Sequence, residues 1–203
     1  MAVIGLIGAK SSGKSEAARC LVEEHGFERL RFADGLKKML RALGLNEAQV
    51  DGDLKEEPSD LLCGKTPRWA MQSLGTEWGR KLIGDNIWTA VTQHQIMERL
   101  CQNPDANIVV DDVRFPNEVI MLHQLGAQVW RVRRPSVEPK YSWLQTFLAQ
   151  AGLSRTIHPS ELYWKVLAAD HDIFNDACLL ELRTKVGWLV EEALAAEQPP
   201  LAA

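Results

Sequence analysis

The sequence predicts an α/β fold, a three-layer α/β/α sandwich around a mostly parallel five-stranded sheet. Short apolar segments alternate along the 203 residues with segments of helical periodicity. The first apolar segment, residues 2–7, ends at a glycine and a helical pattern follows it. A second apolar segment ends in two aspartates at 111 and 112. Alternation of strands with helices favours a parallel sheet with helices on both faces.

The predicted strands are short apolar or alternating runs bounded by glycine or polar residues. The first is apolar throughout, which is typical of a buried parallel strand. Arg29 and Arg31 alternate with Leu30 and Phe32, as in a half-buried strand. The five strands are expected at residues 2–7, 29–32, 107–111, 128–132 and 173–174.

The predicted helices follow from apolar residues at i, i+3, i+4 and i+7, with glycine as a frequent stop. Thr66 and Pro67 mark a helix start, with threonine as the cap, and Asn117 is the expected cap of a later helix. Residues 46–65 are polar and acidic and are expected to form a mobile insertion. Helices are expected at residues 16–25, 36–43, 66–80, 87–101, 117–125, 142–151 and 179–193.

Composition and charge narrow the class of protein. The net charge of -4 gives no electrostatic reason to expect binding to nucleic acid polymers or to membrane surfaces. The four cysteines form no CxxC pair and no zinc-ligand spacing, so reduced thiols in a cytoplasmic protein are expected. No segment approaches about 18 uninterrupted apolar residues, the length of a membrane span.

Residues 8–15 carry the strongest chemical signal. They read GAKSSGKS, which matches the pattern GxxxxGK[ST] between a predicted strand and a predicted helix. Glycines permit a tight turn whose backbone N–H groups converge on phosphate oxygens, and the helix N-terminus adds partial positive charge. The lysine of this pattern reaches the β- and γ-phosphates of a nucleotide, and the serine hydroxyl binds Mg²⁺. The ATP-binding residues are therefore predicted to be Gly8, Ala9, Lys10, Ser11, Ser12, Gly13, Lys14 and Ser15.

Asp111 and Asp112 end the predicted strand 107–111, where a carboxylate near the nucleotide-bound metal is expected. Successive residues of a regular strand face opposite ways, so only one of the two can point at the metal. Each can also be a turn or capping residue.

Arg131, Arg133 and Arg134 follow the strand at 128–132 and precede an irregular segment, residues 135–160. Transfer of a γ-phosphoryl group develops negative charge that nearby cations stabilise. The arginines are therefore catalytic candidates, and the segment is the predicted lid that excludes water. The alternative is that they are solvated arginines at a strand end.

The helix predicted around residues 68–80 offers side chains for a nucleotide acceptor. Gln72 can donate to and accept from a base edge, Arg80 suits a monophosphate, and Trp69 or Trp78 can stack on a base. An amphipathic helix with aromatic core residues is the alternative. His158, followed by Pro-Ser-Glu, resembles a helix start in which it serves as a surface cap.

An ordered set of motifs covering most of the chain resembles the bacteriophage deoxynucleoside monophosphate kinases, a branch of the P-loop nucleoside monophosphate kinases. The blocks QSLGTEWGR and DVRFPNE are the most specific, whereas the P-loop is shared by many families. The matching blocks are GAKSSGKS at 8–15, FADGLK at 32–37, RWAMQSLGTEWGR at 68–80, GDNIW at 84–88, DDVRFPNE at 111–118, VWRVRRP at 129–135, HPSE at 158–161 and DIFND at 172–176.

The resemblance implies Mg²⁺-dependent transfer of the γ-phosphoryl group of ATP to a deoxynucleoside monophosphate for DNA precursor synthesis, and it suggests a homodimer. Asp112 becomes the better acidic candidate, Asn175 an ATP contact, and the three arginines serve the lid. The implied acceptor-binding residues are Phe32, Ala33, Asp34, Lys37, Arg68, Gln72, Trp78, Arg80, Trp88, Asp111 and Arg114.

One kinase domain is expected over residues 1–203, with a helical monophosphate-binding region at about 34–90 and a frayed tail at 197–203. Two alternatives remain. A dephospho-coenzyme-A or shikimate-type kinase shares the P-loop and lid arginines. A nucleotide-binding regulatory ATPase shares only the P-loop. The acidic segment around 51–60 matches no motif.

Overall fold

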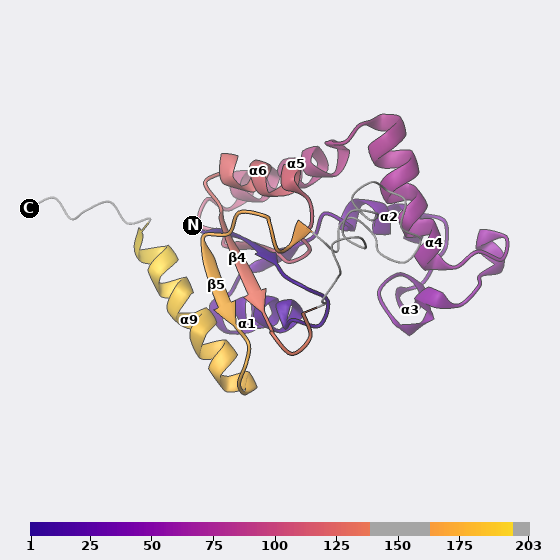
Figure 1. Ribbon diagram of the computed structural model, residues 1–203. Helices are drawn as coiled ribbons and strands as arrows, with labels where there is room; N and C mark the ends of the chain where they lie inside the picture. Colours follow the sequence, from indigo (N-terminus) through magenta and orange to yellow (C-terminus); the bar gives the residue numbers. More distant parts are fainter. Residues whose placement is uncertain (139–162, 197–203) are drawn as a thin grey trace, which may run out of the picture. The chain divides into compact units, whose positions relative to one another are not determined.

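The computed structural model describes residues 1–138 and 163–196 (Figure 1). The chain divides into two compact units. The sheet unit comprises residues 1–30 together with the described part of 96–203, and the helical unit comprises residues 31–95. The predicted lid helix, the motif at His158 and the predicted tail lie outside the described residues.

The sheet has five strands in the order β2-β3-β1-β4-β5, and every neighbouring pair is parallel. This confirms the predicted sheet. The strand expected at 29–32 begins and ends earlier than predicted, because the chain turns after Leu30 and Phe32 is buried beyond the strand. The strands are β1 (Val3–Ile7), β2 (Glu28–Leu30), β3 (Ile108–Val110), β4 (Gln128–Arg133) and β5 (His171–Phe174).

Helices cover both faces of this sheet, which completes the three layers. Ile4 and Leu6 of β1 pack in one core with α1 (Lys14–His25) and α9 (Leu179–Ala196). Gly5, between them, faces α6 (Pro116–Gln124), where a Cβ would lie 2.6 Å from Leu122. Alternating strand residues point to opposite faces, so α6 lies across the sheet from α1 and α9 (Figure 1).

The start of α6 differs from the prediction. Asn117 lies inside the first turn and is not the cap. The Glu118 carboxylate accepts the backbone N–H groups of Arg114 at 2.6 Å and Phe115 at 3.0 Å. Glu118 therefore satisfies amides that precede the helix, and Pro116 opens it because its fixed φ suits a first turn.

The helical unit has its own apolar core of Leu40, Leu45, Val50 and Ala70. Helix α5 (Ile87–Gln102) begins in this unit and ends among residues of the sheet unit. The other elements are α2 (Asp34–Ala42), α3 (Glu47–Val50), the 3-10 helices η1 (Asp53–Glu56) and η2 (Asp60–Leu62), α4 (Pro67–Gln72) and η3 (Ser73–Ile83).

The helix predicted over 66–80 begins as expected, with Thr66 accepting the backbone N–H of Trp69, but from Ser73 it becomes a π-helix. Trp88 explains part of this wider winding, because its Nε1 donates to the Gly75 carbonyl at 2.9 Å. At Gly79 a Cβ would lie 2.7 Å from the same indole. Gly79 of the QSLGTEWGR block thus makes room for a tryptophan, and Gly75 offers it a carbonyl. Turns of π-helix are frequent at functional sites.

Residues 46–65 are folded, so the expectation of a mobile insertion was wrong. Asn46 and Gln49 cap α3 reciprocally with two hydrogen bonds of 3.0 Å. Val50 is fully buried in the core of the helical unit, and Asp51 forms ion pairs with three cations. The acidic composition of this segment gave no indication that Val50 is buried in a core or that the Asp51 carboxylate is paired.

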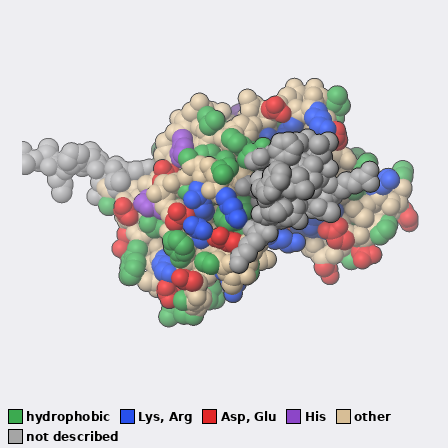
Figure 2. Space-filling view, in the orientation of Figure 1, with side chains coloured by type: hydrophobic (Ala, Val, Ile, Leu, Met, Phe, Trp, Pro, Cys, Tyr) green, Lys and Arg blue, Asp and Glu red, His purple; other side chains and the backbone are tan. Residues whose placement is uncertain are grey.

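In the part of the chain that the structure describes, no helix has the length and apolar character needed to cross a bilayer. On the face shown in Figure 2, acidic and basic side chains are interspersed, in keeping with the small net charge.

Candidate functional site: the phosphate loop and the strand ends around it

The loop between β1 and α1 has the backbone that its motif predicts. Gly8, Ser11 and Gly13 have φ values of 151°, 63° and 105°. A Cβ on Gly8 would lie 2.3 Å from the Val132 carbonyl oxygen, and one on Gly13 would lie 2.4 Å from the Asn175 amide nitrogen. Both positions therefore require glycine for backbone conformation and for space.

Lys14 folds back into this loop. Its Nζ donates to the carbonyls of Gly8 and Ala9, at 2.7 Å each. Burial, with Arg114 adding to it, lowers the pKa of Lys14 to about 8, although the charges of Asp111 and Asp112 oppose the shift. An anion in the loop would favour the charged amine and draw it away from the carbonyls.

Two further groups define the loop. The Ser12 hydroxyl is buried and has no hydrogen-bond partner among residues 1–138 and 163–196. The Asn175 amide donates to the Ser12 carbonyl at 2.9 Å. Asn175, which the resemblance implied as an ATP contact, therefore braces the loop backbone from the end of β5.

Asp111 and Asp112 follow β3, which neighbours β1 in the sheet. Asp111 is buried, and Arg29 donates to its Oδ2. Its Oδ1 is also buried and lacks a partner within the described residues. Asp112 is partly exposed. Since both carboxylates influence the pKa of Lys14, both lie within electrostatic reach of the loop.

The three predicted arginines have different surroundings. Arg131 donates to the carbonyls of Trp164, at 3.1 Å, and Leu167, and pairs with Asp172 at 3.3 Å. It therefore fastens residues 163–167 to the sheet, a role the sequence did not show.

Arg133 forms two hydrogen bonds to Glu138, at 3.0 and 3.2 Å, and lies over the Phe174 ring. Arg131 and Arg133 line a cavity of about 180 Å³ together with Trp164 and Lys165. Arg134 is exposed. Its carbonyl accepts the backbone N–H of Val137 at 3.0 Å, but its guanidinium has no hydrogen bond or ion pair to another described residue.

The predicted acceptor residues fall in the helical unit, apart from Asp111 and Arg114. Asp34 accepts from the backbone and side chain of Arg31, at 2.9 and 3.0 Å. Arg68 pairs with Glu56 at 2.8 Å, and Arg80 donates to the Asp85 carbonyl at 3.3 Å.

The aromatic candidates differ in exposure. Trp88 is only 5% exposed and its N–H is occupied, whereas Trp78, 6.2 Å away between ring centroids, is 38% exposed. Gln72 is exposed and Phe32 is buried. A substrate contact by Trp88 stays a prediction that its burial does not favour.

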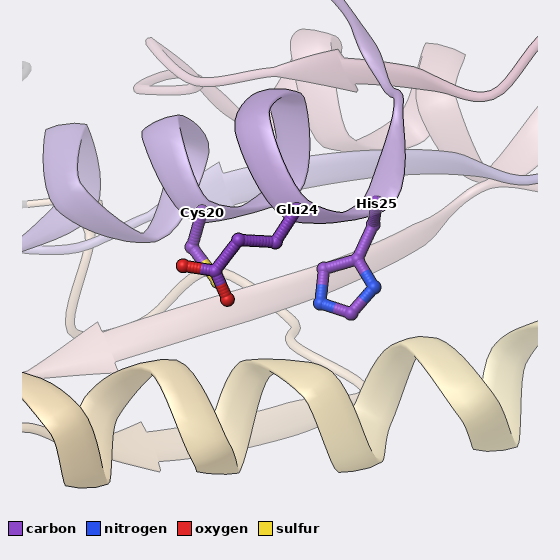
Figure 3. A group of neighbouring side chains, drawn as sticks. All are labelled: Cys20, Glu24 and His25. Carbon is purple, nitrogen blue, oxygen red and sulfur yellow. The ribbon is translucent and has the colours of Figure 1, made fainter.

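A cluster of metal-ligand types lies on the α1 face that meets α9 (Figure 3). It consists of Cys20, Glu24 and His25, whose ligand atoms lie within 4.8 Å of one another. Burial, with the charge of Glu24 adding to it, raises the pKa of the Cys20 thiol to about 11, and Arg183 pairs with Glu24 at 2.8 Å. A protonated thiol and an occupied carboxylate fit helix packing rather than a metal centre.

Comparison with known proteins decides the family. Residues 64–186 match the family model described as deoxynucleotide monophosphate kinase. The chain belongs to the deoxynucleotide monophosphate kinase family. It is 36% identical over 147 residues to a putative deoxynucleotide monophosphate kinase of Acanthamoeba polyphaga mimivirus, covering 68% of this chain and 76% of that protein.

Two further proteins resemble this chain at lower sequence identity. A deoxynucleoside-5′-monophosphate kinase of Escherichia phage T5 is 27% identical over 178 residues, covering 85% of this chain and 69% of that protein. A shikimate kinase from Acinetobacter baumannii, solved with shikimate, superposes with a TM-score of 0.49 at 13% identity, covering 98% of this chain and 96% of that one.

Sequence reasoning missed two residues that shape these sites. Arg29 holds Asp111, and Asp51 holds Lys37. The only signal for Arg29 was its place in β2, because β2 turned out to neighbour β3. Asp51 stands in a segment without a motif, and nothing in the sequence pairs it with residue 37.

Proposed function

We propose that the protein binds ATP in the loop at residues 8–15 and transfers its γ-phosphoryl group to a deoxynucleoside monophosphate, giving the diphosphate and ADP. The observation that carries this proposal is the Lys14 amine inside the glycine-shaped loop, within electrostatic reach of the two carboxylates that follow β3, in a chain of this kinase family. Fold alone hosts many chemistries, whereas this arrangement suits phosphoryl transfer.

Bound ATP replaces the internal partners of Lys14. Backbone N–H groups at the start of α1 and the Lys14 ammonium bind the phosphates, and the Gly8 and Ala9 carbonyls lose their hydrogen bonds to Nζ. The charge on Lys14 stabilises the negative charge that develops on the transferring group. Transfer is direct and in line, from the donor phosphate to an acceptor oxygen, without a phosphorylated side chain.

The residues fit a divalent cation, for which we propose Mg²⁺. The buried Asp111 Oδ1, which has no partner within the described chain, and the carboxylate of Asp112 are hard oxygen donors near the loop. Ser15, the second residue of α1, is exposed. Ser15 and one of the two aspartates, directly or through water, would hold the ion, which neutralises phosphate charge when bound.

Arg133 and Arg134 are the arginines we propose to meet the phosphates. Arg134 is exposed, and Arg133 can exchange its pairing with Glu138 for a phosphate. Arg131 supports the same region by holding residues 163–167, so its contribution to catalysis acts through structure.

We propose that the acceptor binds through four side chains, those of Arg68, Gln72, Arg80 and Arg114. Asp34 and Lys37, at the start of α2, are proposed to bind it as well. The exposed Gln72 suits a base edge and Trp78 suits stacking on the base. A homodimer and a cytoplasmic location also remain proposals.

Turnover with a panel of acceptors tests the function. ADP formation is measured with ATP and each common deoxynucleoside monophosphate, its ribose counterpart, dephospho-coenzyme A and shikimate. We expect turnover with at least one deoxynucleoside monophosphate and none with the last two. Turnover only with a non-nucleotide acceptor, or acceptor-independent ATP hydrolysis, would reject the proposal.

A further inference from the structure

Asp51 is the centre of an ion-pair cluster in the helical unit. Its Oδ1 accepts from Lys37 Nζ at 2.6 Å and from Arg31 at 3.2 Å, and its Oδ2 accepts from Arg41 at 2.6 Å. One carboxylate thus joins cations from the segment before α2 and from two turns of α2 itself. It stands directly after α3, and the burial of Val50 fixes that position.

The surroundings show that this carboxylate is held in its charged form. Burial alone would raise the pKa of Asp51, but the hydrogen bond and charge of Lys37, with Arg31 and Lys55, hold it below its usual value. Lys37 is among the few buried charged side chains of the described residues. A buried ammonium is costly without a counter-ion, so Asp51 is what allows Lys37 to occupy its place.

Among the described residues that these contacts connect, five cations stand beside four carboxylates: Arg31, Lys37, Arg41, Lys55 and Arg68 with Asp34, Glu47, Asp51 and Glu56. Burial is the main cause that lowers the pKa of Lys55 in η1; the charge of Asp51 opposes this shift, and the charges of Lys37, Arg68 and Arg31 add to it. Within the described chain Lys55 has no ion pair of its own. The other three carboxylates form ion pairs as well: Asp34 with Arg31, Glu47 with Arg41 and Glu56 with Arg68. The remaining positive charge suits an added anion.

We propose that Asp51 is a positioning residue of the acceptor site, which holds Lys37 so that the remaining N–H groups of its ammonium face the phosphate of the incoming monophosphate. This inference rests on the proposed function. The ammonium of Lys37 has three donors, and one is held by Asp51, which fixes the orientation of the other two. A lysine stem is flexible, so a fixed second partner reduces the entropy lost when phosphate binds. Residues 46–65, through Asp51, then hold in place the part of α2 that is proposed to bind the acceptor.

A double-mutant cycle tests the proposal. Acceptor KM, ATP KM and kcat are measured for Asp51→Asn, Lys37→Met and the double variant, with Asp53→Asn as the matched control. Asp53 is exposed and forms no ion pair with another described residue. We expect Asp51→Asn to raise acceptor KM about 10- to 100-fold, the range of a hydrogen bond between charged groups, with ATP KM within about twofold. In the Lys37→Met background the same change should add less than about threefold, because Asp51 acts through Lys37.

Other outcomes overturn the proposal. If Asp51→Asn lowers the melting temperature but leaves acceptor KM unchanged, or if it costs the same with and without Lys37, Asp51 is only structural. If Asp51→Asn does not fold, Asp51→Glu keeps the charge and is expected to raise acceptor KM selectively, and an unchanged KM contradicts the proposal. Calorimetric binding of the monophosphate separates the two claims: absent turnover with binding that still depends on Asp51 rejects the proposed function alone.

Discussion

The phosphate loop and the segment at 46–65 are built in opposite ways. In the loop, backbone conformation decides the shape: two glycines accept positive φ, and their missing Cβ atoms leave space for Val132 and Asn175. In the segment, side chains decide: Val50 fills a core and Asp51 pairs with three cations. A structure that depends on backbone conformation can be recognised from consecutive residues. A structure that depends on side-chain contacts cannot, because its partners lie elsewhere in the chain.

The largest effect is expected in the loop. Lys14→Met should lower kcat by about two to three orders of magnitude, because it removes a charge that stabilises the transition state. Steady-state kinetics with saturating acceptor measures it. Lys38→Met, an exposed lysine of α2, is the control and should stay within about twofold. Near-normal kcat in a folded Lys14→Met protein would remove the loop from the mechanism.

Gly8→Ala should weaken ATP binding by about 100-fold, because its Cβ would meet the Val132 carbonyl oxygen at 2.3 Å, at a φ of 151°. Gly26→Ala is the matched control, since Gly26 also has a positive φ, 69°, but has nothing within 4 Å of an added Cβ. That variant should lose about 1 kcal/mol of stability and keep its ATP affinity. Calorimetric titration with ATP compares them, and equal affinities would show that the close approach at Gly8 has no role.

Val50→Ala should reduce the free energy of unfolding by about 2 kcal/mol, because it empties part of a fully buried site. Val22→Ala, at a position 36% exposed, should cost about 0.5 kcal/mol or less. Urea denaturation followed by fluorescence gives both values. If Val50→Ala lowers the free energy of unfolding no more than Val22→Ala does, residues 46–65 are instead the mobile insertion that their composition suggested.

The smallest predicted effect is a pH dependence of ATP binding. Lys14 has a pKa lowered to about 8 in the free protein, and bound phosphate favours its charged form. Below this pH the amine is already protonated, whereas above it binding must take up a proton. The dissociation constant for a non-hydrolysable ATP analogue should therefore rise about tenfold per pH unit above about 8. In Lys14→Met this dependence should vanish, and an unchanged slope would assign it to another group.

The contrast between local patterns and tertiary contacts explains which elements could be predicted from the sequence. The five strands, α1 and the loop were predicted because each depends on neighbouring residues, such as the glycine at 26 that ends α1. The π-helix at 73–83 was not, because it depends on Trp88 packing against Gly79. The start of α6 was misplaced because Glu118 satisfies amides outside the helix.

The site was predictable in part for the same reason. The residue types around the phosphates follow from local motifs, but the partners of Arg131 do not, because Trp164, Leu167 and Asp172 approach it through the fold. Asp111 likewise gained a buried environment through Arg29 on a neighbouring strand. Conformation follows from short sequence patterns, and the choice of ion-pair partners requires the tertiary structure.

The most direct test of phosphoryl transfer follows the label of γ-³²P ATP with each deoxynucleoside monophosphate, in the wild-type protein and in Lys14→Met. We expect label in the deoxynucleoside diphosphate, dependent on the acceptor and reduced at least 100-fold in the variant. Label that appears only as inorganic phosphate, or that stays on the protein after the acceptor is consumed, would contradict direct transfer to a deoxynucleotide.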